Sequence, residues 1–281
     1  MYHLPVIQLL PPTGDSRELH GLYLNEGLQQ RGSTERPFVY SNYVSSIDGR
    51  IALPSPDHST HQVPPAISNA RDWRLFQELA AQADVLITSA RYFRQSQTGE
   101  HQDQLPVGPT KDFADLRDWR LQQGLSAQPD VVVLSNSLDI PVAALQGYPN
   151  RKLFLAVGAG NDLERAHTLT QAVGIGLLQA GEGMGVDGAP LIEELGRQGY
   201  RSIYAIAGPA VLNTLLRGRV LDRLYLTQAH RLLGGMEFDT LNWGPVLTRP
   251  VTLEPVALFL DNHAPQGASQ LIASYDCRYP E

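Results

Sequence analysis

The chain has 281 residues with a formal net charge of −7 at pH 7, and 42% of its residues are hydrophobic. This composition is typical of a globular protein with a sizeable core rather than of a disordered chain. The acidic balance argues against a protein that follows nucleic-acid phosphates with a basic surface. The single cysteine, Cys277, excludes an internal disulfide and a thiolate-rich zinc site.

Residues 1–35 are expected to form an N-terminal extension, with a short helix between Asp15 and Gln30. The apolar start of this segment has no basic leader and stops at Pro11, which is unlike a signal peptide. No run in the sequence approaches the roughly 20 apolar residues that a membrane span needs. We therefore expect a cytoplasmic protein with no membrane and no nucleic-acid partner.

In the rest of the chain, short apolar strands alternate with amphipathic helices. The predicted strands are 38–44, 84–88, 131–134, 152–157, 202–207 and 221–227. One predicted helix is capped by Ser68 or Asn69, and another has Pro209 at its first position. This alternation predicts an α/β fold with a mostly parallel central sheet flanked by helices. Two final strands, 251–260 and 270–279, have no helix between them and predict a C-terminal antiparallel hairpin.

Several common nucleotide-binding and hydrolase motifs are absent from the sequence. It contains no G-x-x-x-x-G-K-[ST] phosphate loop and no G-x-S-x-G nucleophile turn. The glycine-rich run 181–185 is not a dinucleotide fingerprint, because its helix begins only after Asp187 and no acidic ribose ligand follows about twenty residues later. With one cysteine the chain lacks the ligands of a zinc deaminase, and we expect no metal.

Small and polar residues follow the carboxyl ends of four predicted strands. These turns are 45–50, 88–90, 135–137 and 207–210. They are candidates for a binding site, because ligands of open α/β sheets bind beyond the carboxyl ends of the strands. The helix that begins at Pro209 would add free amides and a positive dipole end, which favour phosphate. The same turns are also compatible with ordinary tight connections.

Taken together, these blocks follow a known pattern. They read R-P-F-V-Y and S-I-D-G-R-I-A within 36–52, A-D-V-L-I at 83–87, P-D-V-V-V-L-S at 129–135, and G-R-V-L-D-R-L-Y-L at 218–226 with L-G-G at 233–235. In this order they resemble the pyrimidine reductases of riboflavin biosynthesis, which have a dihydrofolate-reductase-like fold. The resemblance covers residues 36–235 well and the last two strands loosely. It implies that residues 36–281 form a reductase domain.

The resemblance further implies an oxidoreductase that transfers a hydride from NADPH to a ribosylamino-pyrimidinone 5′-phosphate. It implies a cofactor site made of Val44, Gly49, Thr88, Ser89, Ser135, Ala207, Gly208, Pro209, Ala210 and Val211. Within this set, Ser135 would face the ribose and its 2′-phosphate. Asp48 is the nearest titratable candidate for the catalytic delivery of a proton, although an Asp-Gly turn also needs an aspartate for structural reasons. The family is usually dimeric, so a homodimer is implied, with 256–260 as a candidate contact.

Three positions depart from the family pattern. Ile206 stands where an acidic substrate contact is usual, Ala80 where an arginine for the substrate phosphate is usual, and Tyr92 near a common threonine. Other arginines that could meet a phosphate are Arg71, Arg74, Arg91 and Arg94. These departures keep two alternatives open. One is an NADPH-dependent reductase of a different heterocycle, such as a pterin, and the other is a non-catalytic nucleotide-binding homologue.

Overall fold

The computed structural model describes residues 3–58, 60–96, 107–146, 148, 150–206, 208–264 and 267–280. Its strands are β1 (Val6–Leu10), β2 (Ser16–Arg17), β3 (Phe38–Ser46), β4 (Leu53–Pro54), β5 (His61–Gln62), β6 (Val85–Ser89), β7 (Asp130–Leu134), β8 (Leu153–Val157), β9 (Gly176–Gln179), β10 (Ser202–Ala205), β11 (Arg223–Ala229), β12 (Thr252–Asp261) and β13 (Gln270–Arg278). Its α-helices are α1 (Ala70–Ala81), α2 (Ala90–Ser96), α3 (Ala114–Gln122), α4 (Val142–Leu145), α5 (Leu163–Val173), α6 (Gly188–Arg197) and α7 (Pro209–Arg217). Short 3₁₀ helices are η1 (Leu24–Glu26), η2 (Leu28–Gln30) and η3 (Lys111–Phe113).

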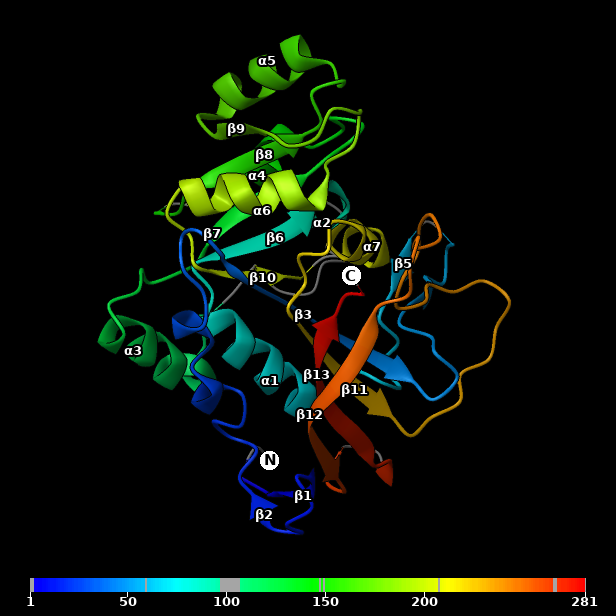
Figure 1. The fold of residues 1–281 in the computed structure, drawn as a ribbon. Helices are drawn as coiled ribbons and strands as arrows, with labels where there is room; N and C mark the ends of the chain where they lie inside the picture. Colours follow the sequence, from blue (N-terminus) through cyan, green and yellow to red (C-terminus); the bar gives the residue numbers. More distant parts are fainter. Residues whose placement is uncertain are drawn as a thin grey trace.

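Eleven of the described strands form one sheet, in the order β2-β1-β12-β13-β11-β3-β10-β6-β7-β8-β9 (Figure 1). The strands from β11 to β9 in this order run parallel to one another. The remaining pairs, which include the β12–β13 hairpin, are antiparallel. The predicted α/β fold, with a mostly parallel sheet and a C-terminal antiparallel hairpin, is confirmed.

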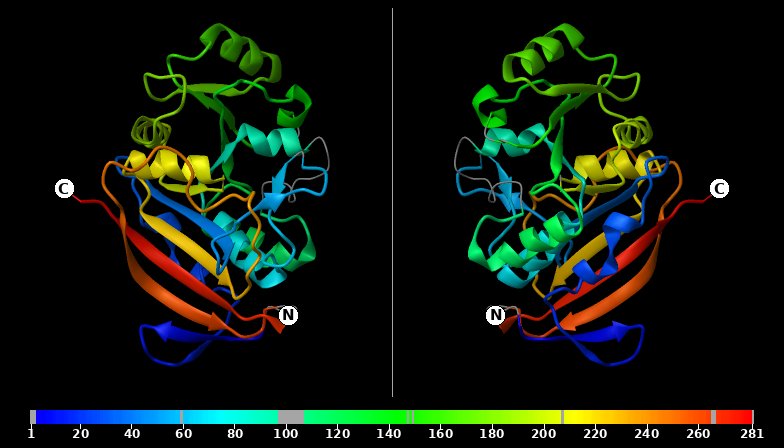
Figure 2. Two further views of the ribbon diagram at one scale, coloured as in Figure 1. Left: turned by 90° about the vertical axis from the view of Figure 1, so that its right-hand side faces the viewer. Right: turned by 90° about the vertical axis from the view of Figure 1, so that its left-hand side faces the viewer.

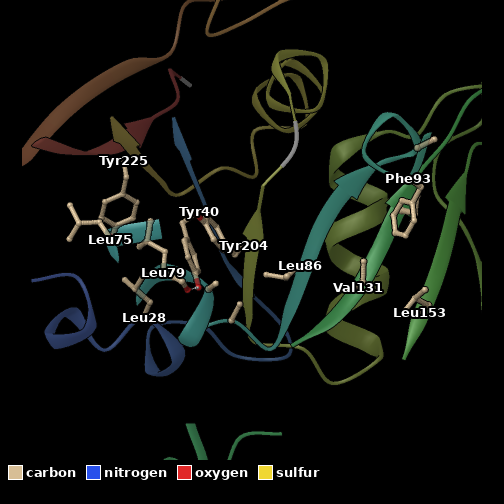
Figure 3. Packing of buried hydrophobic residues seen from close by; sticks show 14 of the residues in the cluster. Leu28, Tyr40, Leu75, Leu79, Leu86, Phe93, Val131, Leu153, Tyr204 and Tyr225 are labelled. Atoms are coloured by element: carbon tan, nitrogen blue, oxygen red, sulfur yellow. Dashed lines mark hydrogen bonds between the residues drawn. The ribbon is translucent and has the colours of Figure 1, made fainter. Parts of the chain in front are cut away.

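Helices cover both faces of the sheet and enclose two hydrophobic cores. Helices α1, α2, α4 and α5 contribute to one core, and α6 and α7 contribute to the other, on the opposite side (Figure 2). Along β7, Val131 and Val133 lie in the first core and Val132 lies in the second, which is the alternation of a strand buried on both faces. In the first core, Tyr40 and Tyr204 stack with ring centroids 5.0 Å apart (Figure 3).

The N-terminal segment does not form the helix that was predicted between Asp15 and Gln30, and this prediction was wrong. The segment contributes β1 and β2, which extend the sheet beyond β12, and the short helices η1 and η2. Gly21 and Gly27 interrupt any regular helix, because their φ angles are 82° and 63°. The buried Glu78 of α1 instead accepts a hydrogen bond from the Gly21 amide at 2.6 Å. The segment therefore packs onto the same sheet as the rest of the chain.

The parallel arrangement places the carboxyl ends of β3, β6, β7, β10 and β11 along one edge of the sheet. The turns that the sequence singled out follow four of these strands, so they share this edge. Among the helices of the described residues, none combines the length and the apolar character that crossing a membrane requires.

Candidate active site

A cavity of about 270 Å³ opens at the carboxyl ends of β3, β6 and β10. Its walls come from these strand ends, from the first half of α1, from the start of α2, and from the loops that follow β3 and β11. The strands and the turns after them supply Asn42, Tyr43, Val44, Thr88, Ser89, Ile206, Gly208 and Pro209. The cavity therefore lies at the edge where open α/β sheets bind their ligands.

Aromatic side chains form a flat part of the cavity wall. Trp73 and Phe76 of α1 stack with ring centroids 4.8 Å apart and an interplanar angle of 8°, and both line the cavity together with Tyr92 of α2. The Asn69 side chain fixes the start of α1, because it accepts hydrogen bonds from the amides of Arg71 and the residue after it. A flat apolar wall of this kind suits a planar ring.

A polar cluster of His61, Arg91 and Asp239 also lines the cavity. The Asp239 carboxylate lies 2.9 Å from Nδ1 of His61 and accepts a hydrogen bond from Nη1 of Arg91 at 3.2 Å. Nη2 of Arg91 donates to the backbone carbonyl of His61 at 2.8 Å. The Asp239 carbonyl accepts a bond from the Ile51 amide at 3.0 Å, so the cluster ties the loop after β11 to the loop after β3.

Arg91 is the one cavity-lining cation among the four arginines considered for phosphate binding. Its side chain is 42% exposed, so it remains accessible beside its carboxylate partner. Arg71 is fully buried in an ion pair with Asp261 at 2.8 Å, and Arg74 is buried against carboxylates of α1 and α3. Arg94 is exposed and donates to a backbone carbonyl outside the cavity.

Asp72 is a cavity-lining carboxyl group near the start of α1 that the sequence pattern did not single out. Only 9% of the residue is exposed. Burial raises the pKa of Asp72 from its ordinary 3.8 to about 6, and a hydrogen bond from the Thr227 hydroxyl of β11 partly opposes this rise. Oδ1 of Asp72 has no hydrogen-bond partner within the described parts of the chain. In the sequence, an aspartate here looks like an ordinary charge at a helix start, because such residues favour the helix dipole.

Asp48 connects two turns and is not among the described residues that line the cavity. Its carboxylate accepts hydrogen bonds from the Ser46 hydroxyl at 2.5 Å and from the amides of Gly234 at 2.8 Å and Leu233 at 3.2 Å. These bonds, of which the Ser46 bond is the strongest influence, hold the pKa of Asp48 well below its usual range. The S-I-D-G turn after β3 is thereby joined to the L-L-G-G turn after β11.

The predicted cofactor residues separate into those that line the cavity and those that do not. Val44, Thr88, Ser89, Gly208 and Pro209 line it. The structure therefore brings together residues of β3, the end of β6 and the start of α7.

The other predicted cofactor residues lie elsewhere or are not described. Gly49 occupies the turn after β3 with a φ of 81°, and Ala210 is exposed on α7. Val211 packs in the second core, and the Ser135 hydroxyl accepts a hydrogen bond at 3.0 Å from the amide three residues further on. Ala207 lies outside the described residues.

The glycine-rich run 181–185 packs against the turn that follows β8. A Cβ atom on Gly158 would lie 2.0 Å from the carbonyl oxygen of Gly183, so the two backbones approach too closely for a side chain. Nδ2 of Asn161 donates to the carbonyls of Asn136 and Met184 at 2.9 and 3.0 Å and joins the turns after β7, β8 and β9. Close packing of backbones accounts for glycine at position 158, and a φ of 101° accounts for glycine at position 181.

The positions that depart from the family pattern have different surroundings. Ile206 and Tyr92 line the cavity. Ala80 is fully buried in the first core and is not among the described cavity residues. An apolar side chain therefore stands at one expected substrate contact, and the other expected contact lies outside the cavity wall.

The chain matches one known protein family over most of its length. The model of the RibD C-terminal domain matches residues 37–256. The chain belongs to this family. The predicted resemblance is thereby confirmed, and so is the dihydrofolate-reductase-like α/β fold that it implies. A search of curated protein sequences finds no match.

Several solved structures share the fold of this RibD C-terminal domain. A pyrimidine reductase-like protein from Corynebacterium diphtheriae has a TM-score of 0.63 and 19% identity, over 87% of this chain and 93% of that chain. RibD from Acinetobacter baumannii has a TM-score of 0.60 and 17% identity, over 87% of this chain and 59% of that chain. The riboflavin biosynthesis reductase Rib7 from Saccharomyces cerevisiae has a TM-score of 0.52 and 16% identity, over 92% of this chain and 99% of that chain.

Proposed function

We propose that this protein is an NADPH-dependent reductase of riboflavin biosynthesis that acts on a ribosylamino-pyrimidinone 5′-phosphate. The observation that carries the proposal is the cavity at the carboxyl ends of β3, β6 and β10 in a chain of the RibD C-terminal domain family. The yeast structure with the same fold is named a riboflavin biosynthesis reductase, which supports this direction. The reaction converts the ribosylamino group into a ribitylamino group.

The residues beside the start of α7 fit the pyrophosphate of NADPH. Gly208 caps this helix with extended backbone, and no side chain caps it. A Cβ atom on Gly208 would meet no atom within 4 Å, so the positive end of the helix is open to an anion. The hydroxyls of Thr88 and Ser89 and the guanidinium of Arg91 line the same cavity and add hydrogen-bond donors. NADPH supplies the hydride when it is bound.

The remaining cavity residues suit the reducible substrate. Trp73 and Phe76 offer a planar apolar surface for the pyrimidinone ring and exclude water from the reacting atoms. Arg91 provides positive charge for the substrate or cofactor phosphate. Asp48 has a lowered pKa and holds no proton at neutral pH, so we assign it the positioning of the turn after β3.

A second candidate function keeps NADPH and replaces the substrate with another heterocycle, such as a pterin. Ile206 favours it, because an apolar residue faces the cavity where an acidic contact was expected. Ala80 favours it as well, because the expected phosphate contact is replaced by a core residue.

We further propose that the enzyme is a cytoplasmic homodimer. Strand β12, the candidate contact, is paired on both edges, so a dimer would use its half-exposed face.

The test is NADPH oxidation by the purified protein with the ribosylamino-pyrimidinone phosphate, and with NADH as the control cofactor. We expect turnover that prefers NADPH. Arg91→Met should raise KM for a phosphate-bearing ligand about tenfold or more, because a charge-assisted contact is lost. Arg94→Met is the matched control on the same helix and should leave KM unchanged.

The outcomes separate the candidates. Failure to bind NADPH would reject the reductase in both forms. Turnover of a pterin but not of the pyrimidinone phosphate would establish the second candidate. NADPH binding without turnover of any heterocycle would identify a non-catalytic nucleotide-binding homologue.

A further inference from the structure

A second cavity, of about 420 Å³, lies where the end of α7 meets the start of α6 and the residues that follow β13. Among the described residues, it shares no lining residue with the reductase cavity at the carboxyl ends of β3, β6 and β10. Pro209, the first residue of α7, lines the reductase cavity, whereas Arg217, the last residue, lines the second one. A helix of this length spans roughly 13 Å along its axis. The second cavity is therefore a separate place in the fold.

Three arginines line the second cavity: Arg217, Arg219 and Arg249. Arg217 and Arg249 are exposed, and within the described parts of the chain their side chains form no ion pair or hydrogen bond. Arg219 donates through Nη2 to the carbonyl of Pro280, and its guanidinium carbon lies 5.7 Å from the ring centroid of Tyr279. Both of these partners line the cavity, so the Arg219 guanidinium lies at its wall.

The charge of the cavity is opposite to that of the whole chain. Asp187 is the one acidic residue among the described lining residues, and it forms no ion pair with the three arginines. Its carboxylate lies against Gly181, because a Cβ atom on that glycine would come within 2.5 Å of Oδ2. Three arginines and one aspartate give the cavity a formal charge of +2, whereas the chain carries −7. A hollow lined mainly by one sign of charge concentrates ions of the opposite sign.

The donors of the second cavity suit a phosphate group. A phosphate carries about two negative charges and three acceptor oxygens, which match the charge of the cavity and its three guanidinium groups. Arginine binds phosphate through two parallel N–H bonds, whereas a carboxylate ligand would bring only one negative charge. Residues 187–190 add the uncapped start of α6, whose positive end favours the same anion. The volume of the cavity is that of a site for a small molecule.

We propose that the second cavity binds the phosphate group of a soluble, phosphorylated small molecule. Arg217 and Arg249, which the described residues leave without partners, would hold the phosphate, and Arg219 would complete the site from the opposite side of the chain's turn at Tyr279. The inference goes beyond the proposed function, which assigns no ligand to this end of α7.

The experiment is calorimetric titration of sodium pyrophosphate at constant ionic strength into protein saturated with NADP⁺. The NADP⁺ occupies the proposed pyrophosphate site at the start of α7, so the heat reports on the second cavity. The wild type should bind one pyrophosphate with a dissociation constant below about 1 mM. The double variant Arg217→Met/Arg249→Met should bind it at least about tenfold more weakly, because two charge-assisted contacts are lost.

The matched control is the double variant Arg165→Met/Arg201→Met. It removes two exposed arginines that are not among the lining residues, and so it changes the net charge by the same amount. Its affinity for pyrophosphate should stay within about twofold of the wild-type value, because only non-specific attraction is altered. Equal melting temperatures of the two double variants would show that both are folded.

Absence of pyrophosphate binding by the NADP⁺-saturated wild type would overturn the inference, whatever the variants do. Equal weakening in both double variants would overturn it as well, because the attraction would then be non-specific. Failure of NADP⁺ to bind would count against the reductase alone. In that case the comparison of the two double variants still decides the role of the second cavity, because pyrophosphate at the start of α7 would not respond to Arg217 and Arg249.

Discussion

Replacing Asp72 with asparagine should stabilise the protein at neutral pH. The residue is 9% exposed, and burial raises the pKa of its carboxyl group from 3.8 to about 6. The folded state therefore holds the proton more tightly than the unfolded state does. The stabilising effect of this proton is complete below about pH 4 and is lost as the pH rises through about 6. Above that, folding requires a charged carboxylate to be buried.

The size of the effect follows from the two pKa values. A rise from 3.8 to about 6 corresponds to about 3 kcal/mol, at about 1.4 kcal/mol for each pKa unit. About 2 kcal/mol of this penalty develops between pH 4.5 and pH 7.5, because the group is already partly ionised in the unfolded state at the lower pH. Asparagine has nearly the same shape and carries no charge at either pH. Any effect of the asparagine amide on the free energy of unfolding is the same at both pH values. It therefore cancels when the effects of the substitution at the two pH values are subtracted.

The assay is urea unfolding of the wild type and Asp72→Asn at pH 4.5 and pH 7.5. The gain in free energy of unfolding should be about 2 kcal/mol larger at pH 7.5. Asp118→Asn, at an exposed position of α3, is the control and should change the free energy by less than about 0.5 kcal/mol at either pH. Equal effects of Asp72→Asn at the two pH values, or a larger destabilisation at pH 7.5, would refute the assignment of a buried charge.

Two further predictions concern residues outside the cavity. Arg120→Met should lower the free energy of unfolding by about 3 kcal/mol in urea titration. The buried guanidinium donates to the carbonyls of Ala81 and Ala83 at 2.8 Å each at the end of α1, and an unchanged midpoint would contradict this role. Asp48→Asn should lower the melting temperature, because it weakens the bonds from Leu233 and Gly234, and should keep the pH profile of turnover. Loss of the basic limb of that profile would instead identify Asp48 as the proton donor.

The central part of the fold could be predicted because its signals are local. The run at β7 reads D-V-V-V-L and is buried on both faces, which is the pattern of a parallel strand between two helical layers. The strands of the large sheet that were missed lie at its ends, and the missed strands β4 and β5 form a separate two-stranded sheet. β1 pairs with β12, so that Ile7 lies opposite Leu260, a partner far away in the sequence. β9 has four residues and pairs only with β8 among the described strands. Strands as short as β1 and β9 give only a weak local pattern. The pairing of β1 with β12 also depends on residues that are far away in the sequence.

The candidate site was predictable only where it follows strand ends. Thr88 and Ser89 end β6 and Gly208 lies in the turn after β10, and the parallel sheet brings such positions to one edge. His61 lies in the two-residue strand β5 and Asp239 in the loop after β11, so their side-chain contact at 2.9 Å joins positions far apart in the sequence. Asp72 has an ordinary place at the start of a helix, and its chemistry arises from burial by other elements.

This contrast separates the residues that join the turns from the residues that line the cavity. The S-I-D-G and L-L-G-G blocks, which carried the resemblance most clearly, meet through Asp48 and hold two turns beside the cavity. Asp72 and Trp73 lie on α1 outside these blocks and line the cavity directly. An ionised Asp72 reduces stability, whereas Asp48 is held by several hydrogen bonds, so the two aspartates have opposite effects on the fold. Substitutions on α1 should therefore change which ring is bound without disturbing the strand-end turns, and substitutions at Asp48 should affect those turns first.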